Sequence, residues 1–321
     1  ANTTGATNTA VGASALTANT TGAQNTVIGS SAGLALTTGS SNVAVGFEAL
    51  KNEDADGLNT AIGTQALFAQ NAGADAYNVG VGYQAGAAIT TGTNNTIIGG
   101  LAGDATTTGE RNTAVGTSSL TTNTTGSGNS AFGFKSLENS TTASNNTAFG
   151  QDTLRATTTG TDNVAVGIDA LTANTTGAEN TAVGSGALDA NTTASGNSAF
   201  GKDSLGANTT GSSNAAYGSN SLKVNTTGGS NVAIGIGSLQ ANTTANNNTA
   251  VGKSALGANT TGTQNVAVGS ISLDANTTGN YNTAVGYETL TTNTTGAENT
   301  ALGTSSMKQN TTGTYLSLIH I

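Results

Sequence analysis

NTAVGSGALDANTTASG, residues 180–196, is the stretch that decides the fold, because the whole chain repeats it. A Gly follows a short apolar segment in each of eighteen copies, and successive copies are 17 residues apart at every step but one, a 19-residue coil over 64–82. We count positions from this Gly, so that Asn180 is at −4, Gly184 at 0 and Leu188 at +4. A strict period in a chain of biased composition is typical of a stacked repeat protein.

The residues before the Gly alternate with a period of two. Position −1 is always Val, Ile, Phe, Tyr or Leu, position −3 is Thr, Val, Ser or Ala, and position −2 is nearly always Ala. This pattern favours a strand. A helix does not fit, because Gly and Asn recur every few residues and 17 is a poor multiple of 3.6. We therefore predict an all-β fold, a β-solenoid (β-roll) of about eighteen stacked 17-residue coils over residues 1–313.

Position −4 is Asn in all eighteen copies. An Asn that recurs at every turn of a stack suits a ladder in which each side-chain amide bonds its copy in the next coil. The predicted structural ladder includes Asn146, Asn163, Asn180, Asn197, Asn214, Asn231, Asn248, Asn265 and Asn282.

Two apolar positions of each coil are expected to form the core. Position −1 supplies one side chain, and position +4, which is Leu in fourteen copies, supplies the other. Where +4 is Gly33 or Gly86, an apolar residue follows at +7, as Leu36 or Ile89, and is expected to fill the same slot. The expected core residues are Val166, Val183, Phe200, Ile234, Val251, Val268, Leu171, Leu188 and Leu205.

This core is thin for 17 ordered residues, since two buried apolar side chains contribute only about 1.5–3 kcal/mol each. Association of identical chains would bury more, and the columns of Ala and Ser suggest where a second chain approaches. We predict a parallel homotrimer, with a monomeric solenoid as the alternative. The last residues, 314–321, break the repeat and are expected to be either a cap or translated sequencing-adapter sequence.

Charge and composition exclude several function classes. The net charge of −9, with eight scattered Lys and Arg, argues against nucleic acid as a partner. No apolar run approaches the roughly 20 residues that span a bilayer. The chain has no Cys and one His, His320, so zinc sites and Ser–His–acid triads cannot be assembled in the repeats. We expect no enzyme activity and no cofactor.

Two weaker candidate sites remain. Glu53, Asp54 and Asp56 replace N-T-T-G in one coil and could bind Ca²⁺, although a solvated loop is the simpler interpretation. Asn-Thr-Thr matches the N-glycosylation acceptor, but its repetition is explained more simply by ladder packing. That motif recurs at Asn174, Asn191 and Asn208.

Thr occupies positions +8 and +9 in nearly every copy. Ordered ranks of Thr on a flat solenoid suggest ice binding, and the outward ranks would include Thr192, Thr193, Thr209 and Thr210. Adjacent residues of a strand face opposite sides, so only one of the two ranks can point outward.

The segments N-V-A-V-G at 163–167 and N-V-A-I-G at 231–235 resemble the S-V-A-I-G core of head repeats in YadA-like trimeric autotransporter adhesins. The resemblance covers the chain from Asn8 to about Gly313. It implies a left-handed β-roll, assembled as a parallel homotrimer on the bacterial surface, that binds host matrix or other surfaces. The family's usual repeat is shorter, and here an added A-N-T-T-G segment lengthens each coil.

The longer repeats also look like those in tail fibres of marine phages. Our leading expectation is an adhesive or spacer segment of a surface-exposed trimeric adhesin, which contacts a surface, matrix or glycan through repeated faces. A phage tail fibre and an ice-binding solenoid are the alternatives. The expected location is extracellular, on a bacterial surface or a virion.

Overall fold

The computed structural model describes residues 2–55 and 57–319. Within these residues the protein is all-β, with no helix and therefore none that could cross a membrane. The chain divides into two compact units, unit 1 at residues 1–162 and unit 2 at residues 163–321. Both units are parallel β-solenoids with one three-residue strand per coil, as the sequence predicts.

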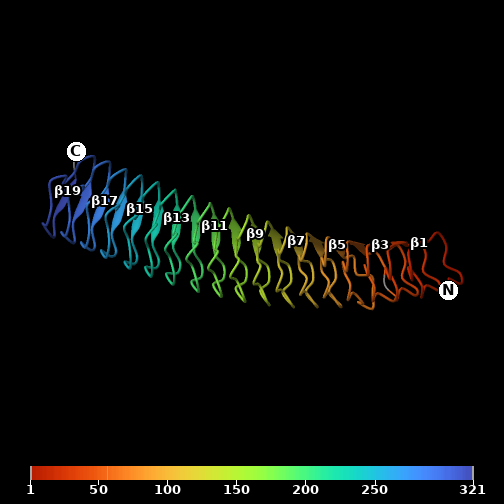
Figure 1. Ribbon diagram of the computed structural model, residues 1–321. Helices are drawn as coiled ribbons and strands as arrows, with labels where there is room; N and C mark the ends of the chain where they lie inside the picture. The colour runs from red at the N-terminus through yellow and green to blue at the C-terminus, as the bar shows by residue number, and fades with distance from the viewer. Residues whose placement is uncertain (1, 56, 320–321) are drawn as a thin grey trace. The chain divides into compact units, whose positions relative to one another are not determined.

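Unit 1 contains nine strands, which lie side by side in Figure 1. Each pairs in parallel with the next, so that like positions of neighbouring coils lie opposite one another. The strands are β1 Thr9–Val11, β2 Thr26–Ile28, β3 Val43–Val45, β4 Thr60–Ile62, β5 Val79–Val81, β6 Thr96–Ile98, β7 Thr113–Val115, β8 Ser130–Phe132 and β9 Thr147–Phe149.

Unit 2 contains ten strands with the same parallel, in-register pairing. The last of them lies in the segment that breaks the repeat, where Leu316 takes the place of the recurring Asn. The strands are β10 Val164–Val166, β11 Thr181–Val183, β12 Ser198–Phe200, β13 Ala215–Tyr217, β14 Val232–Ile234, β15 Thr249–Val251, β16 Val266–Val268, β17 Thr283–Val285, β18 Thr300–Leu302 and β19 Ser317–Ile319.

The Gly at position 0 turns the chain out of each strand. Gly184 has φ of 140°, in a region that residues with a side chain rarely adopt, and a Cβ there would lie 2.5 Å from the carbonyl oxygen of Gly201. The coils therefore stack as closely as backbone allows at this corner.

Three further positions of a coil adopt left-handed backbone without being Gly. In one coil these are Asp203 at +2 with φ of 54°, Leu205 at +4 with φ of 52° and Ser213 at +12 with φ of 61°. Such a conformation is uncommon for residues other than Gly, Asn and Asp. Its repetition makes the tight corners of the 17-residue coil, and at +4 it brings the Leu side chain inside, where Leu171, Leu188 and Leu205 are fully buried as expected.

The phase of the strand is opposite to the one that we predicted. The middle residue at −2 faces the interior, and Ala182 is fully buried, whereas positions −3 and −1 face outward. The −1 residues of the expected core are therefore misassigned. Val166, Val183, Phe200, Val251 and Val268 are half-buried, and Ile234 is 42% exposed. The Ala and Ser columns, expected to receive a second chain, lie inside instead, as Ala187 and Ser204 show.

The narrow interior explains this phase, because an inward residue at −2 shares its space with the Leu at +4. Where +4 is Gly103, position −2 is the larger Ile97, and a Cβ on Gly103 would lie 3.0 Å from Cδ1 of Ile97. Gly33 is paired in the same way with Val27, whose Cγ atoms would lie 3.4 Å from such a Cβ. Ala at −2 is therefore the residue that leaves room for Leu. Leu36 and Ile89 are fully buried, which confirms that they fill the interior from position +7.

The 19-residue coil keeps the stack in register. Thr60 of β4 still pairs with Val79 of β5, and the N–H of Asn71 bonds the carbonyl of Thr90. The two added residues lie between Asn71 and Ala76, where Gly73 has no atom within 4 Å of its would-be side chain. The insertion is therefore accommodated as a surface bulge.

Candidate interaction surface

The outward side of the strands is an uncharged face formed by positions −3 and −1, which we call the sheet face. Position −1 is a large apolar residue in all nineteen strands, and neither position carries a charge in any of them. Several of these side chains are well exposed, for example Phe149 in unit 1 at 57% and Leu302 in unit 2 at 45%. Exposed apolar side chains on one charge-free face make it a candidate interaction surface.

Aromatic residues on the sheet face stack along each unit. In unit 1 the rings of Phe132 and Phe149 have centroids 5.5 Å apart, and in unit 2 the rings of Phe200 and Tyr217 lie 4.8 Å apart and nearly parallel. Because parallel pairing sets like positions opposite one another, adjacent aromatic residues at −1 must meet. The parallel stacking of coils thus fixes the spacing of the side chains on the sheet face.

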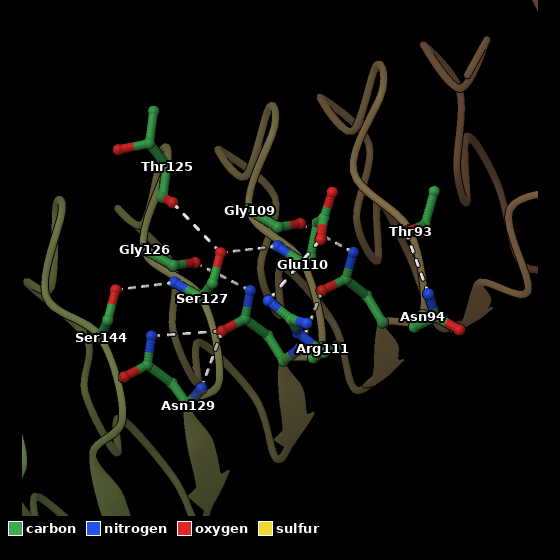
Figure 2. Close-up of polar contacts among 12 residues, drawn as sticks. Thr93, Asn94, Gly109, Glu110, Arg111, Thr125, Gly126, Ser127, Asn129 and Ser144 are labelled. Carbon is green, nitrogen blue, oxygen red and sulfur yellow. Dashed lines mark hydrogen bonds and ion pairs between the residues drawn. The ribbon is translucent and has the colours of Figure 1, made fainter. Parts of the chain in front are cut away.

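The predicted Asn column at −4 is a buried ladder, although its bonds differ from those expected. Figure 2 shows Asn129, whose backbone N–H and Nδ2 lie 3.0 and 3.2 Å from Oδ1 of Asn112. The Nδ2 of Asn129 also donates to the carbonyl of Ala143 at 2.9 Å. The side-chain oxygen therefore mainly accepts a backbone N–H of the next coil. All nine predicted ladder residues are fully buried or nearly so.

A second Asn ladder in unit 2, at position +7, is made by the amides themselves. Each Nδ2 donates to Oδ1 of the Asn one coil earlier, from the pair Asn191 and Asn174 to the pair Asn310 and Asn293, at 2.8–3.1 Å. These are the Asn of the N-T-T motifs. Asn174, Asn191 and Asn208 are fully buried, so the folded chain does not present them as glycosylation acceptors.

Position +7 is mixed in unit 1, which therefore lacks a continuous second ladder. The residues there, in chain order, are Asn19, Leu36, Glu53, Gln70, Ile89, Thr106, Asn123, Ser140 and Thr157. Among the described residues, seven buried side-chain atoms have no hydrogen-bond partner, and six of the seven belong to this column. The two units thus differ inside while their sheet faces are alike.

The two Thr ranks have different environments. Thr192 at +8 is half-buried, and its hydroxyl donates to the carbonyl of Thr209 at 3.2 Å, as Thr209 does to Thr226. Thr193 and Thr210 at +9 are exposed. Of the predicted outward ranks, one faces solvent, and in unit 2 it is a file of nine consecutive Thr at +9.

Charged residues gather at the edge formed by positions +2 and +5. Lys51 donates to Glu48 at 2.7 Å in unit 1, and this hydrogen bond lowers the pKa of the Glu48 carboxyl. Partial burial raises the pKa of the carboxyls of Asp104, Asp189 and Asp274, all at position +5. Nearby carboxylates raise the pKa of Asp189 and Asp274 further. Fourteen of the 25 charged residues lie at positions +2 and +5, and none lies at −3 or −1 on the sheet face.

The candidate ligand-binding residues do not converge. Glu53 is fully buried and accepts a bond from Nδ2 of Asn59 at 3.4 Å, whereas Asp54 is exposed. Asp56 and His320 lie outside the described residues. Within the part of the chain that the structure describes, no three His, Cys, Asp or Glu side chains form a group that could hold a metal ion.

Comparison with known proteins adds no assignment. No protein-family model matches the chain. A search of curated proteins gives no match. The sheet face, the two ladders and the Thr file are therefore the features from which function is argued.

Proposed function

We propose that this chain is a repetitive segment of a surface-exposed homotrimeric fibre, adhesive or spacer in role, and that it has no catalytic activity. The observation that carries the proposal is the sheet face, where all nineteen −1 residues are large, apolar and turned outward. Such a column would be costly to leave in water at every coil. A partner that covers it along the chain explains its uniformity.

The occupant that fits best is another copy of the same chain. A partner must offer an apolar strip that repeats at the strand spacing of about 4.8 Å, and a parallel copy offers it at every coil. In each unit, three copies can turn their sheet faces toward a common axis. Since the chain carries a net charge of −9, close approach of copies also requires a charge-free contact face.

In the trimer the charged edge and the Thr file of each chain stay outside. Those surfaces repeat at every coil, so contact with a matrix, glycan or other surface is multivalent and does not need one deep site. This arrangement suits an extracellular adhesin of a bacterium, and a phage tail fibre uses the same physics. Nucleic acid is a poor partner because acidic groups predominate at the edge.

Retention on coated surfaces tests the adhesive role. The whole chain is expected to bind a surface coated with matrix protein or bacterial glycan, and Val183→Lys/Val251→Lys should abolish retention by separating the chains. Ser185→Lys/Ser270→Lys is the matched control, because it adds the same charge at +1, where Lys202 and Lys253 already occur. Equal retention of both double variants and the parent would refute adhesion through the assembled fibre.

A second candidate function is ice binding, which the exposed +9 Thr file favours. Thr presents a methyl and a hydroxyl group, and in unit 2 the file is unbroken over nine coils from Thr176 to Thr312. Inhibition of ice recrystallisation by the parent, lost in Thr193→Tyr/Thr244→Tyr, would support it. An inactive parent protein would remove this candidate.

A further inference from the structure

Four consecutive coils of unit 1 carry, at position +7, a buried oxygen that has no hydrogen-bond partner. The atoms are Oγ1 of Thr106, Oδ1 of Asn123, Oγ of Ser140 and Oγ1 of Thr157. All four residues are fully buried. Buried polar atoms in native proteins are seldom left unpaired, so this run needs an explanation.

The complete ladder of unit 2 shows what is missing. There Oδ1 of one Asn accepts a bond from Nδ2 of the Asn in the following coil, as Oδ1 of Asn191 does from Asn208. The coil after Asn123 has Ser140 at this position. A Ser side chain has two heavy atoms where Asn has four, so it neither reaches Oδ1 of Asn123 nor fills the space of an amide.

Rotating the amide of Asn123 by half a turn would not solve the problem, because an existing hydrogen bond would be lost. Its Nδ2 already donates to the carbonyl of Gly126 at 3.0 Å. Its Oδ1 can only accept, so the missing partner must be a donor. The Ser140 hydroxyl can donate or accept, and so can a water molecule.

We propose that a water molecule is bound inside unit 1 between Oδ1 of Asn123 and Oγ of Ser140, in the place of the amide nitrogen that unit 2 has there. The water donates one hydrogen to Oδ1 of Asn123 and accepts the hydroxyl hydrogen of Ser140. Oγ1 of Thr157 lies one coil beyond Ser140, roughly 7 Å along the stack from this water, and is not one of its partners. Oxygens about 4.8 Å apart in neighbouring coils are within reach of one water at about 2.8 Å from each.

The chemistry of the site selects water over an apolar occupant. Dry cavities in proteins are lined by apolar groups, whereas a buried water typically makes about three hydrogen bonds to otherwise unpaired polar atoms. The same column shows the contrast at Asn19, whose Oδ1 is also unpaired but is followed by the apolar Leu36. The inference is therefore confined to Asn123 and Ser140.

A crystal structure of the whole chain at a resolution that shows ordered water tests the inference. We expect a water within about 3.2 Å of both Asn123 Oδ1 and Ser140 Oγ. Ser140→Asn should replace that water by its Nδ2, close the ladder to Asn123 and raise the thermal midpoint by about 2 °C. Ser185→Asn, the same change at an exposed position, should leave the midpoint unchanged.

Ser140→Ala keeps the inference testable if the Asn variant does not fold. It removes one of the two hydrogen-bond partners and adds no bulk, so the water should be weakened or lost while the chain stays folded. A dry site in the parent, a water equally well ordered in the parent and in Ser140→Ala, or an Asn123 Oδ1 bonded by a protein donor, would overturn the proposal. A lowered midpoint for a folded Ser140→Asn would also overturn it.

Discussion

The amide nitrogen of Asn208 lies 3.0 Å from Oδ1 of Asn191, one coil earlier, and donates a hydrogen bond to it. Asn225 in turn donates to Oδ1 of Asn208 at 2.9 Å. Inside unit 2 this chain of amides runs along the stack at position +7, where unit 1 has Leu36 in one coil and Ile89 in another. Each Asn between the two ends of the ladder is hydrogen-bonded to the Asn before it and to the Asn after it. These bonds compensate the free-energy cost of burying the amides.

Asn208→Ala is expected to destabilise the protein by about 3 kcal/mol, because Oδ1 of Asn191 and Nδ2 of Asn225 each lose a partner while they stay buried. The free energy of unfolding in denaturant measures the effect. Thr193→Ala removes a side chain of similar size from the exposed file and should change that free energy by less than about 0.5 kcal/mol. Equal effects of the two changes would contradict the ladder.

Gly184→Ala is expected to lower the free energy of unfolding by about 3 kcal/mol or more. The new Cβ would lie 2.5 Å from the carbonyl oxygen of Gly201, and φ of residue 184 is 140°. Gly100→Ala is the control, since nothing lies within 4 Å of a Cβ at that position. Thermal unfolding of both variants separates a close backbone approach from a general effect of losing Gly.

The shared space of positions −2 and +4 predicts strong coupling between two substitutions in unit 1. Ile97→Ala alone should cost about 2–5 kcal/mol through the cavity that it leaves. Gly103→Leu alone should cost about 1–3 kcal/mol through overpacking. Together they restore the Ala and Leu pair of the other coils, so the double variant should recover about 2 kcal/mol or more of the summed loss. Additive losses in a double-mutant cycle would show that the two positions do not share one space.

The raised pKa of the Asp274 carboxyl predicts how the free energy of unfolding depends on pH. Burial raises the pKa of its carboxyl in the folded chain, so the unfolded chain loses this proton first as the pH rises. The contribution of Asp274 to stability is therefore full below the ordinary pKa of Asp and declines as the pH rises through the raised value. Asp274→Asn should stabilise the protein at pH 7, by about 0.5 kcal/mol or less, and not at pH 3. Thr193→Ala, at an exposed uncharged residue, should show no such difference in denaturant melts at the two pH values.

The period of the sequence was sufficient to predict the parallel stack, the in-register pairing and the alignment of the −4 Asn in a ladder. These depend on repetition alone, since identical positions must meet once the coils stack. The 19-residue coil did not disturb the prediction because its two added residues leave the stack as a bulge. The burial of Leu36 and Ile89 was also predictable from their spacing, and Cδ1 of Ile89 would lie 2.8 Å from a Cβ on Gly86, whereas Val27 is the side chain near Gly33.

The facing of the strand was predicted wrongly, because alternation defines two faces without saying which one is inside. Hydrophobicity favoured Val183 over Ala182 for the interior, yet the narrow coil admits Ala182 beside the Leu column. The signal that could have decided it is in the sequence, where Gly103 is accompanied by Ile97 and Gly33 by Val27. With the strand turned this way, the apolar column becomes a surface that a partner can cover.

The molar mass of the whole chain in solution, measured by light scattering, tests the central claim most directly. We expect three times the chain mass of 30.9 kDa, and one chain mass for Val183→Lys/Val251→Lys with its β-sheet circular dichroism retained. A parent protein that scatters as a single chain, and whose mass and thermal midpoint are unchanged by the two lysines, would contradict the account.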